Sequence, residues 1–356
     1  MDRSSIRHHF PLLEGTAYLN AGTNGPMAIS AVDAAERELG AQRDTGRSMA
    51  HHERRAELQA GLRVAYAGVL GCDAEELALT TSTSEGLGRV LAGLDLGPDD
   101  EILTSDQEHP GLIGPLLAAR RRGARIRMAP LATIARSIEA STTLVACSHV
   151  GWIGGELADP ALADASVPVV LDGAQGAGAV AVDVRALGCV AYAAAGQKWL
   201  CGADGTGMLY VAPELMHRLT PIAPSYDSFS DNSRGLESPL REDARRHDTP
   251  SLARESVALN LAAHDALAEG GWPAVHARAT ALAAQLAHAL AGSGRVVAPR
   301  AGTTLVAWED DDPVATRDRL AAAGVVVRNL PRTPYLRASV GAWNDEHDLE
   351  RLLSAL

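Results

Sequence analysis

Short apolar runs alternate with stretches of helical periodicity through the first 250 residues of this 356-residue chain. Such runs, bounded by polar or glycine-containing segments, predict strands that are buried on both faces. The predicted strands are residues 77–80, 101–104, 126–129, 143–148, 167–171, 190–194 and 207–211. Helical patterns lie between several of them, at 84–94, 111–121 and 159–165. This repetition predicts an α/β fold with a mostly parallel central sheet flanked by helices.

The pattern changes after residue 220. Residues 221–250 are rich in Ser, Asp, Arg and Pro, show little periodicity and predict a long loop. Two long helices are predicted next, at 251–270 and 272–291. They are followed by a strand (303–308), a helix (313–323), two strands (325–328 and 336–340) and a final helix (346–355). We therefore expect an N-terminal arm (1–15), a large domain (16–250), and a helical connection with a small C-terminal α/β domain (251–356).

Composition narrows the function classes. The net charge of −12 argues against binding to nucleic acid or to an acidic membrane surface. The one compact basic run, residues 120–122, is explained by its place at a predicted helix C-terminus. No apolar span reaches membrane-crossing length, and residues 1–10 do not resemble a signal peptide. The four cysteines are scattered without CxxC or metal-type spacing, so we expect a cytoplasmic protein with reduced thiols and no metal site.

Lys198 is the only lysine, since the other 31 of the 32 basic residues are arginine. Arginine replaces lysine wherever only a positive charge is required, but its guanidinium does not lose a proton at accessible pH. Schiff-base chemistry needs an amine that does. The single lysine is therefore a candidate nucleophile, although one lysine could also remain by chance on a solvated face.

Asp172 ends the predicted strand 167–171, and Gln175 follows in the same loop. Lys198 follows the next predicted strand, so both side chains would reach one pocket at the carboxyl ends of the strands. A Schiff-base lysine with an aspartate facing a pyridinium nitrogen is typical of pyridoxal 5′-phosphate enzymes. Taken alone, Asp172 could equally cap a loop.

Two further segments lie at strand ends. Ser82, Thr83 and Ser84 precede a predicted helix, where hydroxyl and backbone N–H groups can bind a phosphate, or can form an ordinary N-cap. His109 follows the strand 101–104 and could stack on a cofactor ring or move protons. A lone histidine is more often a polar core or surface residue, so this interpretation depends on the other groups.

With these residues the chain resembles the fold-type I pyridoxal-phosphate enzymes, in the class V aminotransferase and cysteine desulfurase family. The matching stretches occur in the family's order from Tyr18 to Asp345: YLNAGTNGPM, TSTSEGL, DQEHPGLIGPL, SHVGWIGG, VVLDGAQGAGAVAVD, GQKWLCGADGTGMLYV and LRASVGAWND. The pair LDGAQ and GQKWL is the most specific. The resemblance implies pyridoxal 5′-phosphate as cofactor and the fold-type I architecture.

The resemblance also implies a function for each matching position. Lys198 would form the Schiff base and move the Cα proton, Asp172 would pair with the ring nitrogen, and His109 would stack on the ring. The other implied cofactor-binding residues are Ser82, Thr83, Ser84, Gln175, Gln197 and Thr249. Thr249 would reach the phosphate of a neighbouring subunit, which implies a homodimer with shared active sites. The implied substrate-binding residues are Arg337, for a carboxylate, together with Asn24, Trp152 and Arg328.

The chain departs from the family at informative positions. Ala195 stands where many members have a phosphate-binding serine, and Gln197 stands where desulfurases have a histidine. Trp152 replaces an asparagine of the desulfurases, as in the branch that resembles isopenicillin N epimerase. Residues 327–335, which precede Arg337, contain no cysteine, although desulfurases need one there. Persulfide-forming desulfuration is therefore disfavoured.

We expect an enzyme that acts at Cα of an amino acid, and an aminotransferase in particular because no further residue is required. The alternative is a β-eliminating C–S lyase, and a third possibility is an epimerase, which needs a second base. Arg328 or Arg332 would either bind a second acidic group or be solvated at the surface, and the loop from Tyr226 to Arg246 would cover the site and set side-chain selectivity. A nicotinamide-dependent enzyme is disfavoured because no GxGxxG opens a helix. A non-catalytic regulator is disfavoured by the intact set of site residues.

Overall fold

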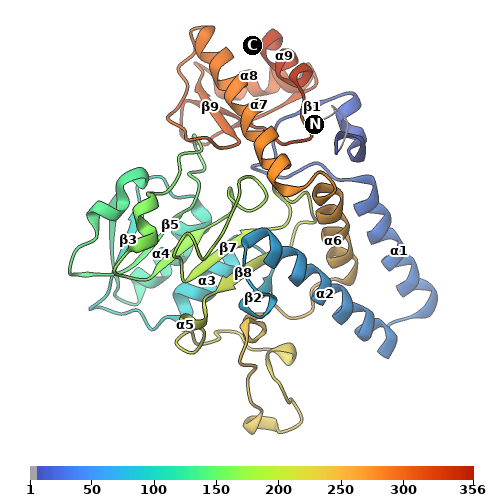
Figure 1. The fold of residues 1–356 in the computed structure, drawn as a ribbon, viewed down its shortest axis with the longest axis vertical. Coiled ribbons are helices and arrows are strands. Elements are labelled where there is room, and N and C mark those ends of the chain that lie inside the picture. Colours follow the sequence, from blue (N-terminus) through green and yellow to red (C-terminus); the bar gives the residue numbers. More distant parts are fainter. Residues whose placement is uncertain (1–5) are drawn as a thin grey trace.

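The computed structural model describes residues 6–356 and shows a large α/β body with a smaller unit packed on it (Figure 1). The N-terminal segment runs beside the small C-terminal unit, and α7 connects this unit to the body. Residues 1–5 of the expected N-terminal arm lie outside the described residues. The division at residues 15/16 and 250/251 stays a prediction.

The large body is built on a seven-stranded sheet with the order β2-β8-β7-β6-β5-β3-β4. The strands are β2 (Leu77–Thr80), β3 (Glu101–Ser105), β4 (Arg125–Ala129), β5 (Thr142–Ser148), β6 (Val169–Asp172), β7 (Ala191–Ala195) and β8 (Gly207–Val211). Neighbouring strands are parallel except on the two sides of β8, which runs antiparallel to β2 and β7. The predicted mostly parallel sheet and the positions of all seven strands are confirmed.

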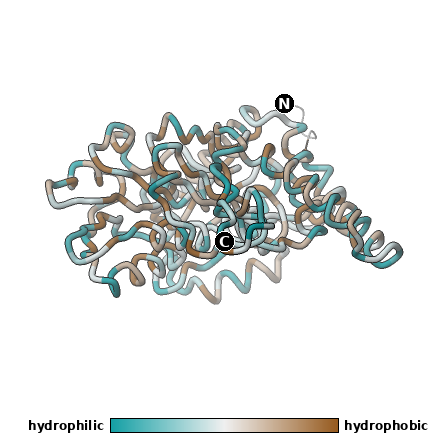
Figure 2. The backbone as a smooth tube through the Cα atoms, turned by 90° about the horizontal axis from the view of Figure 1, so that it is seen from below, coloured by the Kyte–Doolittle hydropathy of each residue, from teal (hydrophilic) through white to brown (hydrophobic). Residues whose placement is uncertain are grey.

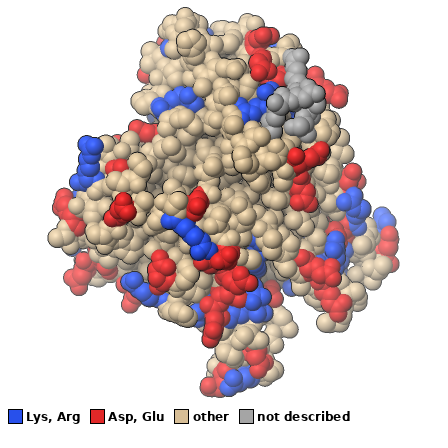
Figure 3. All heavy atoms as spheres, in the orientation of Figure 1, with Lys and Arg blue, Asp and Glu red and all other residues tan. Residues whose placement is uncertain are grey.

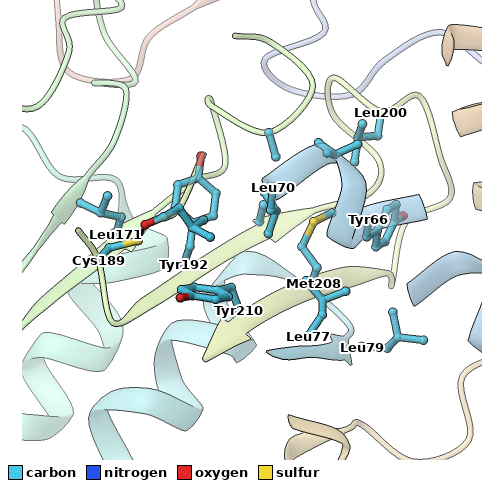
Figure 4. Packing of buried hydrophobic residues seen from close by; sticks show 14 of the residues in the cluster. Tyr66, Leu70, Leu77, Leu79, Leu171, Cys189, Tyr192, Leu200, Met208 and Tyr210 are labelled. Carbon is cyan, nitrogen blue, oxygen red and sulfur yellow. Dashed lines mark hydrogen bonds between the residues drawn. The ribbon is translucent and has the colours of Figure 1, made fainter. Parts of the chain in front are cut away.

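Helices cover both faces of this sheet. The helices of the large body are α1 (Ile29–Thr45), α2 (Met49–Leu70), α3 (Thr83–Gly93), α4 (Pro110–Arg121), α5 (Pro213–Met216) and α6 (Arg254–Ala268), of which α1 packs on α6. Alternate residues of β7 belong to different cores: Tyr192 packs with residues of α2, and Ala193 packs with residues of α3 and α4. Figure 4 shows Tyr66 and Leu70 of α2 close to Met208 and Leu77 of the sheet. In Figure 2, hydrophobic and hydrophilic residues alternate along the chain, including the helices that protrude at the right.

Two helices, α1 and α2, were not predicted from the sequence. Both mix small, charged and apolar residues without a continuous apolar stripe, so helical periodicity is weak. Tertiary contacts hold them instead. In particular, Glu38 of α1 binds the guanidinium of Arg254 in α6, with a separation of 2.8 Å.

The small unit contains an antiparallel sheet in the order β11-β12-β9 and a two-stranded pair of β1 with β10. Its strands are β1 (Ala17–Tyr18), β9 (Leu305–Glu309), β10 (Val325–Val326), β11 (Arg328–Asn329) and β12 (Tyr335–Ser339). Its helices are α7 (Trp272–Gly292), α8 (Pro313–Ala322) and α9 (Glu346–Ala355). The parallel pairing of β1 with β10 brings the N-terminal segment to the C-terminal unit. The predicted small α/β unit is confirmed.

Two predicted elements were wrong. Residues 159–165 form a short 3₁₀ turn (Pro160–Asp164) and not an α-helix; Asp159 caps the Ala161 N–H, and the segment ends after one turn. The predicted strand 325–328 is two strands in different sheets, since β10 pairs with β1 while β11 pairs with β12. Apolar periodicity does not reveal such a change of partner.

Residues 221–250 form the expected excursion, which projects from the body as the yellow segment of Figure 1. It contains the 3₁₀ turns Tyr226–Ser228, Gly235–Glu237 and Ala244–His247, and Leu236 is fully exposed. Ser228 and His247 of the segment are buried against the body, and the expectation that the loop covers the site stays a prediction.

Surface charge and the hydropathy of the helices concern the partners expected from the sequence. On the face shown in Figure 3, charged side chains lie mainly toward the lower and outer parts, and acidic groups are numerous among them. Among residues 6–356, no helix is long and apolar enough to cross a membrane.

Candidate active site

Asp172 and Lys198 lie at the carboxyl ends of adjacent parallel strands. Asp172 is the last residue of β6, and Lys198 follows the end of β7. Each side chain influences the other: the carboxylate raises the pKa of Lys198, and the ammonium lowers the pKa of Asp172. Their charged atoms nevertheless lie more than 4.0 Å apart, so they form no direct ion pair. A group could therefore be placed between them.

The pKa of the Lys198 amine is lowered toward neutral pH. Burial lowers its pKa from 10.5 to about 8, against the opposing effect of Asp172, and the charges of Arg337 and Arg328 lower it further. At neutral pH a useful fraction of the amine is therefore uncharged. This is the property that distinguishes a lysine nucleophile from an arginine.

A buried hydrogen-bond network fixes the backbone that carries Lys198. Asn260 Oδ1 of α6 accepts hydrogen bonds from Tyr66 of α2 (2.8 Å) and from Thr206 (2.9 Å). This amide also packs against Gly196 and Gly202, where a Cβ atom would lie 2.4 Å and 1.9 Å from Asn260 Oδ1. Both positions therefore require glycine, and the loop between them is held in one conformation.

The turn that carries Asp172 is held from beneath by a buried pair of rings. Asp172 is 4% exposed, and its Oδ1 accepts a hydrogen bond from the Ala174 N–H (2.9 Å). Tyr192 Oη and His149 Nδ1 lie 3.0 Å apart below the turn, and a Cβ atom on Gly173 would lie 1.9 Å from the Tyr192 ring. Burial raises the pKa of Asp172, and the nearby Lys198 ammonium and the Ala174 N–H lower it, so both favour the charged carboxylate.

His109 caps α4, and its Nδ1 accepts a hydrogen bond from the Gly111 N–H (3.0 Å). Burial lowers its pKa to about 4, with further lowering by Lys198, Arg337 and Arg328. The ring is therefore neutral near pH 7. It contacts Trp152 edge to face with 5.3 Å between the ring centres, which leaves a flat neutral ring beside the pocket.

Arg337 connects the small unit to this pocket. It lies in β12, is 2% exposed, and donates from Nη1 to the carbonyl of Trp152. Burial and Arg328 lower its pKa to about 9. A Cβ atom on Gly22 would lie 2.9 Å from Gln175 Oε1 and 3.0 Å from Arg337 Nη2, so the N-terminal segment passes between these two side chains. Three parts of the chain that are distant in sequence thus meet here.

Gln175 is buried, and its side-chain amide forms two hydrogen bonds. Its Nε2 donates to the Gly22 carbonyl (2.8 Å), and its Oε1 accepts from Trp199 Nε1 (2.9 Å). The second Nε2 hydrogen remains available for a ligand. Gln197 carries a buried Oε1 without a partner and is half-buried beside Lys198.

The predicted phosphate segment forms the N-terminus of α3. Ser82 is the N-cap and accepts the Glu85 N–H at 3.1 Å, while the buried Thr83 hydroxyl has no partner. Ser84 Oγ lies 2.6 Å from where a Cβ atom on Gly111 would be, so the N-termini of α3 and α4 are adjacent. Free N–H groups and hydroxyls at two helix N-termini suit an anion.

The remaining predicted residues are half-buried or exposed. Thr249 Oγ1 hydrogen-bonds to the Glu85 carboxylate at 2.7 Å, beside the phosphate segment, and its contact with a second subunit stays a prediction. Arg328 is half-buried and donates to Thr23 Oγ1 (3.0 Å), whereas Arg332 is exposed. The side chain of Asn24 is exposed, although its carbonyl accepts from Tyr18 Oη at 2.9 Å.

Sequence reasoning missed Glu108, which is buried next to His109. Its carboxylate accepts hydrogen bonds from Ser105 (2.5 Å) and from the Ser148 hydroxyl (2.6 Å) and N–H (2.9 Å). Burial raises its pKa. Glu108 ties the strand ends of β3 and β5 together below His109. Its position beside His109 in the motif DQEHPGLIGPL was the available signal, and the sequence did not indicate its burial.

These residues fit pyridoxal 5′-phosphate. The gap between Lys198 and Asp172 suits a ring with an aldehyde at one end and a nitrogen at the other. The unpartnered Thr83 hydroxyl and the N-terminus of α3 suit its phosphate, and the unpartnered Gln197 oxygen lies beside Lys198. The donor set therefore agrees with the cofactor expected from the sequence.

One group of side chains with metal-binding chemistry occurs among residues 6–356. It consists of His8, His9 and Glu269, whose ligand atoms lie within 4.8 Å of one another. His9 Nε2 lies 2.8 Å from Glu269 Oε2. The group joins the N-terminal segment to the end of α6 and is not part of the Lys198 pocket.

Known proteins resemble this chain over most of its length. The family model described as aminotransferase class-V matches residues 18–352. Isopenicillin N epimerase from Streptomyces clavuligerus is 29% identical over 339 residues, covering 83% of this chain and 82% of that protein. A probable cysteine desulfurase from Methanothermobacter thermautotrophicus is 29% identical over 240 residues, covering 62% of this chain and 59% of that protein's length.

The solved structures of the cystine C–S lyase C-DES are also similar. Its complex with the reaction product cysteine persulfide has a TM-score of 0.90 and 27% identity, and the match covers 97% of this chain and 98% of that chain. A mutant of C-DES carries glycine covalently linked to its pyridoxal-phosphate cofactor, again with a TM-score of 0.90.

Proposed function

Because the chain belongs to the aminotransferase class-V family and is a pyridoxal-phosphate-dependent enzyme, we propose that it is a β-eliminating C–S lyase that acts on cystine or a similar amino acid. The observation that carries the proposal is the match to the cystine C–S lyase C-DES along nearly the whole chain. The aminotransferase expected from the sequence agrees with the family. The structural likeness to C-DES supports the C–S lyase, which was the alternative expected from the sequence, better than the aminotransferase.

The cysteines of the chain support a lyase over a desulfurase. The segment before Arg337 contains no cysteine, so it offers no thiol to accept sulfur. Cys147, Cys189 and Cys201 are buried, and burial raises the pKa of each thiol; Cys72 is half-buried, with its pKa raised to about 12. A thiol with a raised pKa forms little thiolate and is a poor sulfur acceptor. Sulfur would therefore leave with the product.

The proposed steps assign one task to each group. The cofactor, when bound, supplies an electron sink for the electrons of the Cα–H bond. Arg337 binds the substrate carboxylate, and Lys198 Nζ takes the Cα proton. The bond from Cβ to sulfur then breaks, and both of its electrons leave on sulfur as a persulfide anion. The remaining three-carbon fragment hydrolyses to pyruvate and ammonia.

Charge in the pocket supports a substrate with two carboxylates. Lys198, Arg337 and Arg328 are cationic when protonated, and Asp172 is the one carboxylate that influences Lys198. Arg328 lowers the pKa of Lys198, His109 and Arg337 and is paired with an uncharged hydroxyl, so it has no acidic partner of its own. Cystine carries a second carboxylate that Arg328 would bind. Arg332, which is exposed, would not take part.

The function is tested with purified holoenzyme and L-cystine. We expect catalytic release of pyruvate and ammonia together with a persulfide that cyanide converts to thiocyanate, without any added keto acid. Conversion of the cofactor to its pyridoxamine form, with a requirement for a keto-acid acceptor, would establish an aminotransferase and contradict the proposal. Persulfide retained on the protein would establish a desulfurase and contradict it as well.

We further propose a homodimer in which Thr249 of one chain contacts the phosphate bound by the other. Thr249 lies at the edge of the phosphate segment, and the excursion beside it projects away from its own chain. Sedimentation velocity of the holoenzyme tests the assembly. A monomer with full activity would exclude shared sites.

Replacing Arg328 with glutamine is expected to raise the KM for cystine by about 10- to 100-fold, since a hydrogen bond to a charged group contributes about 1.5–3 kcal/mol. The KM for S-methylcysteine, which has one carboxylate, should change far less. Arg332→Gln is the matched control and should leave both KM values unchanged. Equal losses with both substrates would show that Arg328 does not bind a second carboxylate.

The pKa of Lys198 predicts how the cofactor-free protein reacts with pyridoxal phosphate. Only the neutral amine attacks the aldehyde, and a pKa of about 8 makes roughly 10% of it neutral at pH 7, against roughly 0.03% for an unperturbed lysine. The rate should therefore rise with pH and level off above pH 8. Growth of the visible absorption band in stopped-flow experiments measures this rate. A rise that continues to pH 10 would contradict the lowered pKa.

A further inference from the structure

A cavity of about 220 Å³ lies between α4 and the strands β3 and β4, at the edge of the central sheet. Its walls come from the side of α4 that carries Ile113, Leu117 and Arg120. His109, at the start of the same helix, contacts Trp152 in the active site and does not line this cavity. The cavity therefore shares α4 and Glu108 with the surroundings of the active site, although His109 itself does not line it.

The walls of this cavity are largely apolar, and several of them are accessible to solvent. Ile113 is 40% exposed, Leu117 is 42% exposed and Met128 of β4 is 70% exposed, and Ile126 and Leu116 lie deeper. An apolar concavity of this kind suits the apolar part of a small ligand, because binding would remove this surface from water.

Thr104 of β3 supplies an unsatisfied polar group in the wall. It is 3% exposed, and its hydroxyl has no hydrogen-bond partner among the described residues. Buried hydroxyl groups are nearly always hydrogen-bonded, and leaving one unpaired is unfavourable. The hydroxyl therefore points to a ligand with a polar atom at this place.

Arg120 supplies a free positive charge at another part of the wall. Within residues 6–356, its guanidinium forms no ion pair and no hydrogen bond. Its neighbours differ: Arg122 donates to the Leu91 carbonyl (2.6 Å), and Arg127 pairs with Glu101 (3.0 Å). Arg120 is thus available for an anionic group, and a carboxylate matches its planar fork.

Two acidic residues also line the cavity, near the ends of the strands. Glu108 is buried, and both of its oxygens already accept hydrogen bonds from Ser105 and Ser148. Asp106 is exposed. The acidic residues therefore do not compete with a ligand for Arg120, and they disfavour a second negative charge at their end of the cavity.

We propose that this cavity binds an amphipathic monocarboxylate, specifically a hydroxyaryl carboxylate. The carboxylate pairs with Arg120, the ring lies against Leu117 and Met128, and the hydroxyl hydrogen-bonds to Thr104. This site is independent of the proposed lyase reaction.

The test is isothermal titration calorimetry of the holoenzyme with para-hydroxyphenylbutanoate. We expect saturable binding, no binding of phenylbutylamine, and weaker binding of phenylbutanoate, which lacks the hydroxyl. Arg120→Gln should weaken binding by about tenfold, because a charge-assisted pair is lost. Arg121→Gln, which removes a neighbouring charge outside the cavity, is the matched control and should change the Kd by less than about twofold. Thr104→Val should abolish the preference for the hydroxylated probe.

The active-site arginine could bind the same probe, so Arg337→Gln is included. Binding that survives Arg337→Gln and falls in Arg120→Gln supports the proposal. Binding that is lost in Arg337→Gln but retained in Arg120→Gln overturns it, as does the absence of saturable binding to the wild-type holoenzyme. Leu117→Trp, which fills the cavity, should also remove binding. If Leu117→Trp does not fold, Arg120→Gln and Arg121→Gln still decide the test.

Discussion

Replacing Lys198 with alanine is expected to lower the rate of pyruvate release from cystine by about 10⁴-fold or more. The variant loses the amine that holds the cofactor and accepts the Cα proton, and no second lysine can replace it. The fold should persist, because Lys198 forms no ion pair and burial disfavours its charge. Single-turnover pyruvate release measures the loss, and circular dichroism checks the fold.

Lys198→Arg is the control that separates charge from proton transfer. It keeps the positive charge near Asp172, but the guanidinium does not release a proton at working pH. It should therefore be as inactive as the alanine variant. Added methylamine should partly restore Cα proton removal in Lys198→Ala, because a small amine can enter the space that is left. An active Lys198→Arg variant would show that Lys198 is not the base.

The sequence predicts the central sheet well because each strand is a short apolar run between polar segments. The strands Leu77–Thr80 and Gly207–Val211 begin and end where they were expected. The helices Ile29–Thr45 and Met49–Leu70 were not expected, since their stability comes from packing against α6 rather than from a local pattern. Strand partners in the small unit were also unpredictable, because pairing is a long-range property.

The site was predictable where chemistry depends on residue type and unpredictable where it depends on packing. Lys198, Asp172 and His109 could be proposed as site residues because few other residue types suit these tasks at strand ends, and their functions stay predictions. The support of Asp172 by Tyr192 and His149 was not found, since a buried tyrosine in an apolar strand looks like ordinary core. The approach of Gly22 to Arg337 was also not found, because the two residues meet only through the pairing of β1 with β10.

Asp172→Asn is expected to lower turnover by about 10²- to 10⁴-fold without lowering the thermal stability of the cofactor-free protein. Asparagine has the same shape and can still accept the Ala174 N–H, but it lacks the charge that keeps the ring nitrogen protonated. Burial raises the pKa of Asp172, so its charge is unfavourable in the cofactor-free chain and its removal should leave Tm unchanged or raised.

Asp248→Asn provides the contrast that makes this result specific. Asp248 is also buried, but it pairs with Arg63 at 2.7 Å and accepts the Leu79 N–H at 2.9 Å. Breaking a buried ion pair by removing one partner costs about 3–5 kcal/mol, so this variant should lose several degrees of Tm. Calorimetry of both cofactor-free variants measures the difference. If Asp172→Asn lost as much stability as Asp248→Asn, Asp172 would be a structural carboxylate, and its loss of activity would not report on the cofactor.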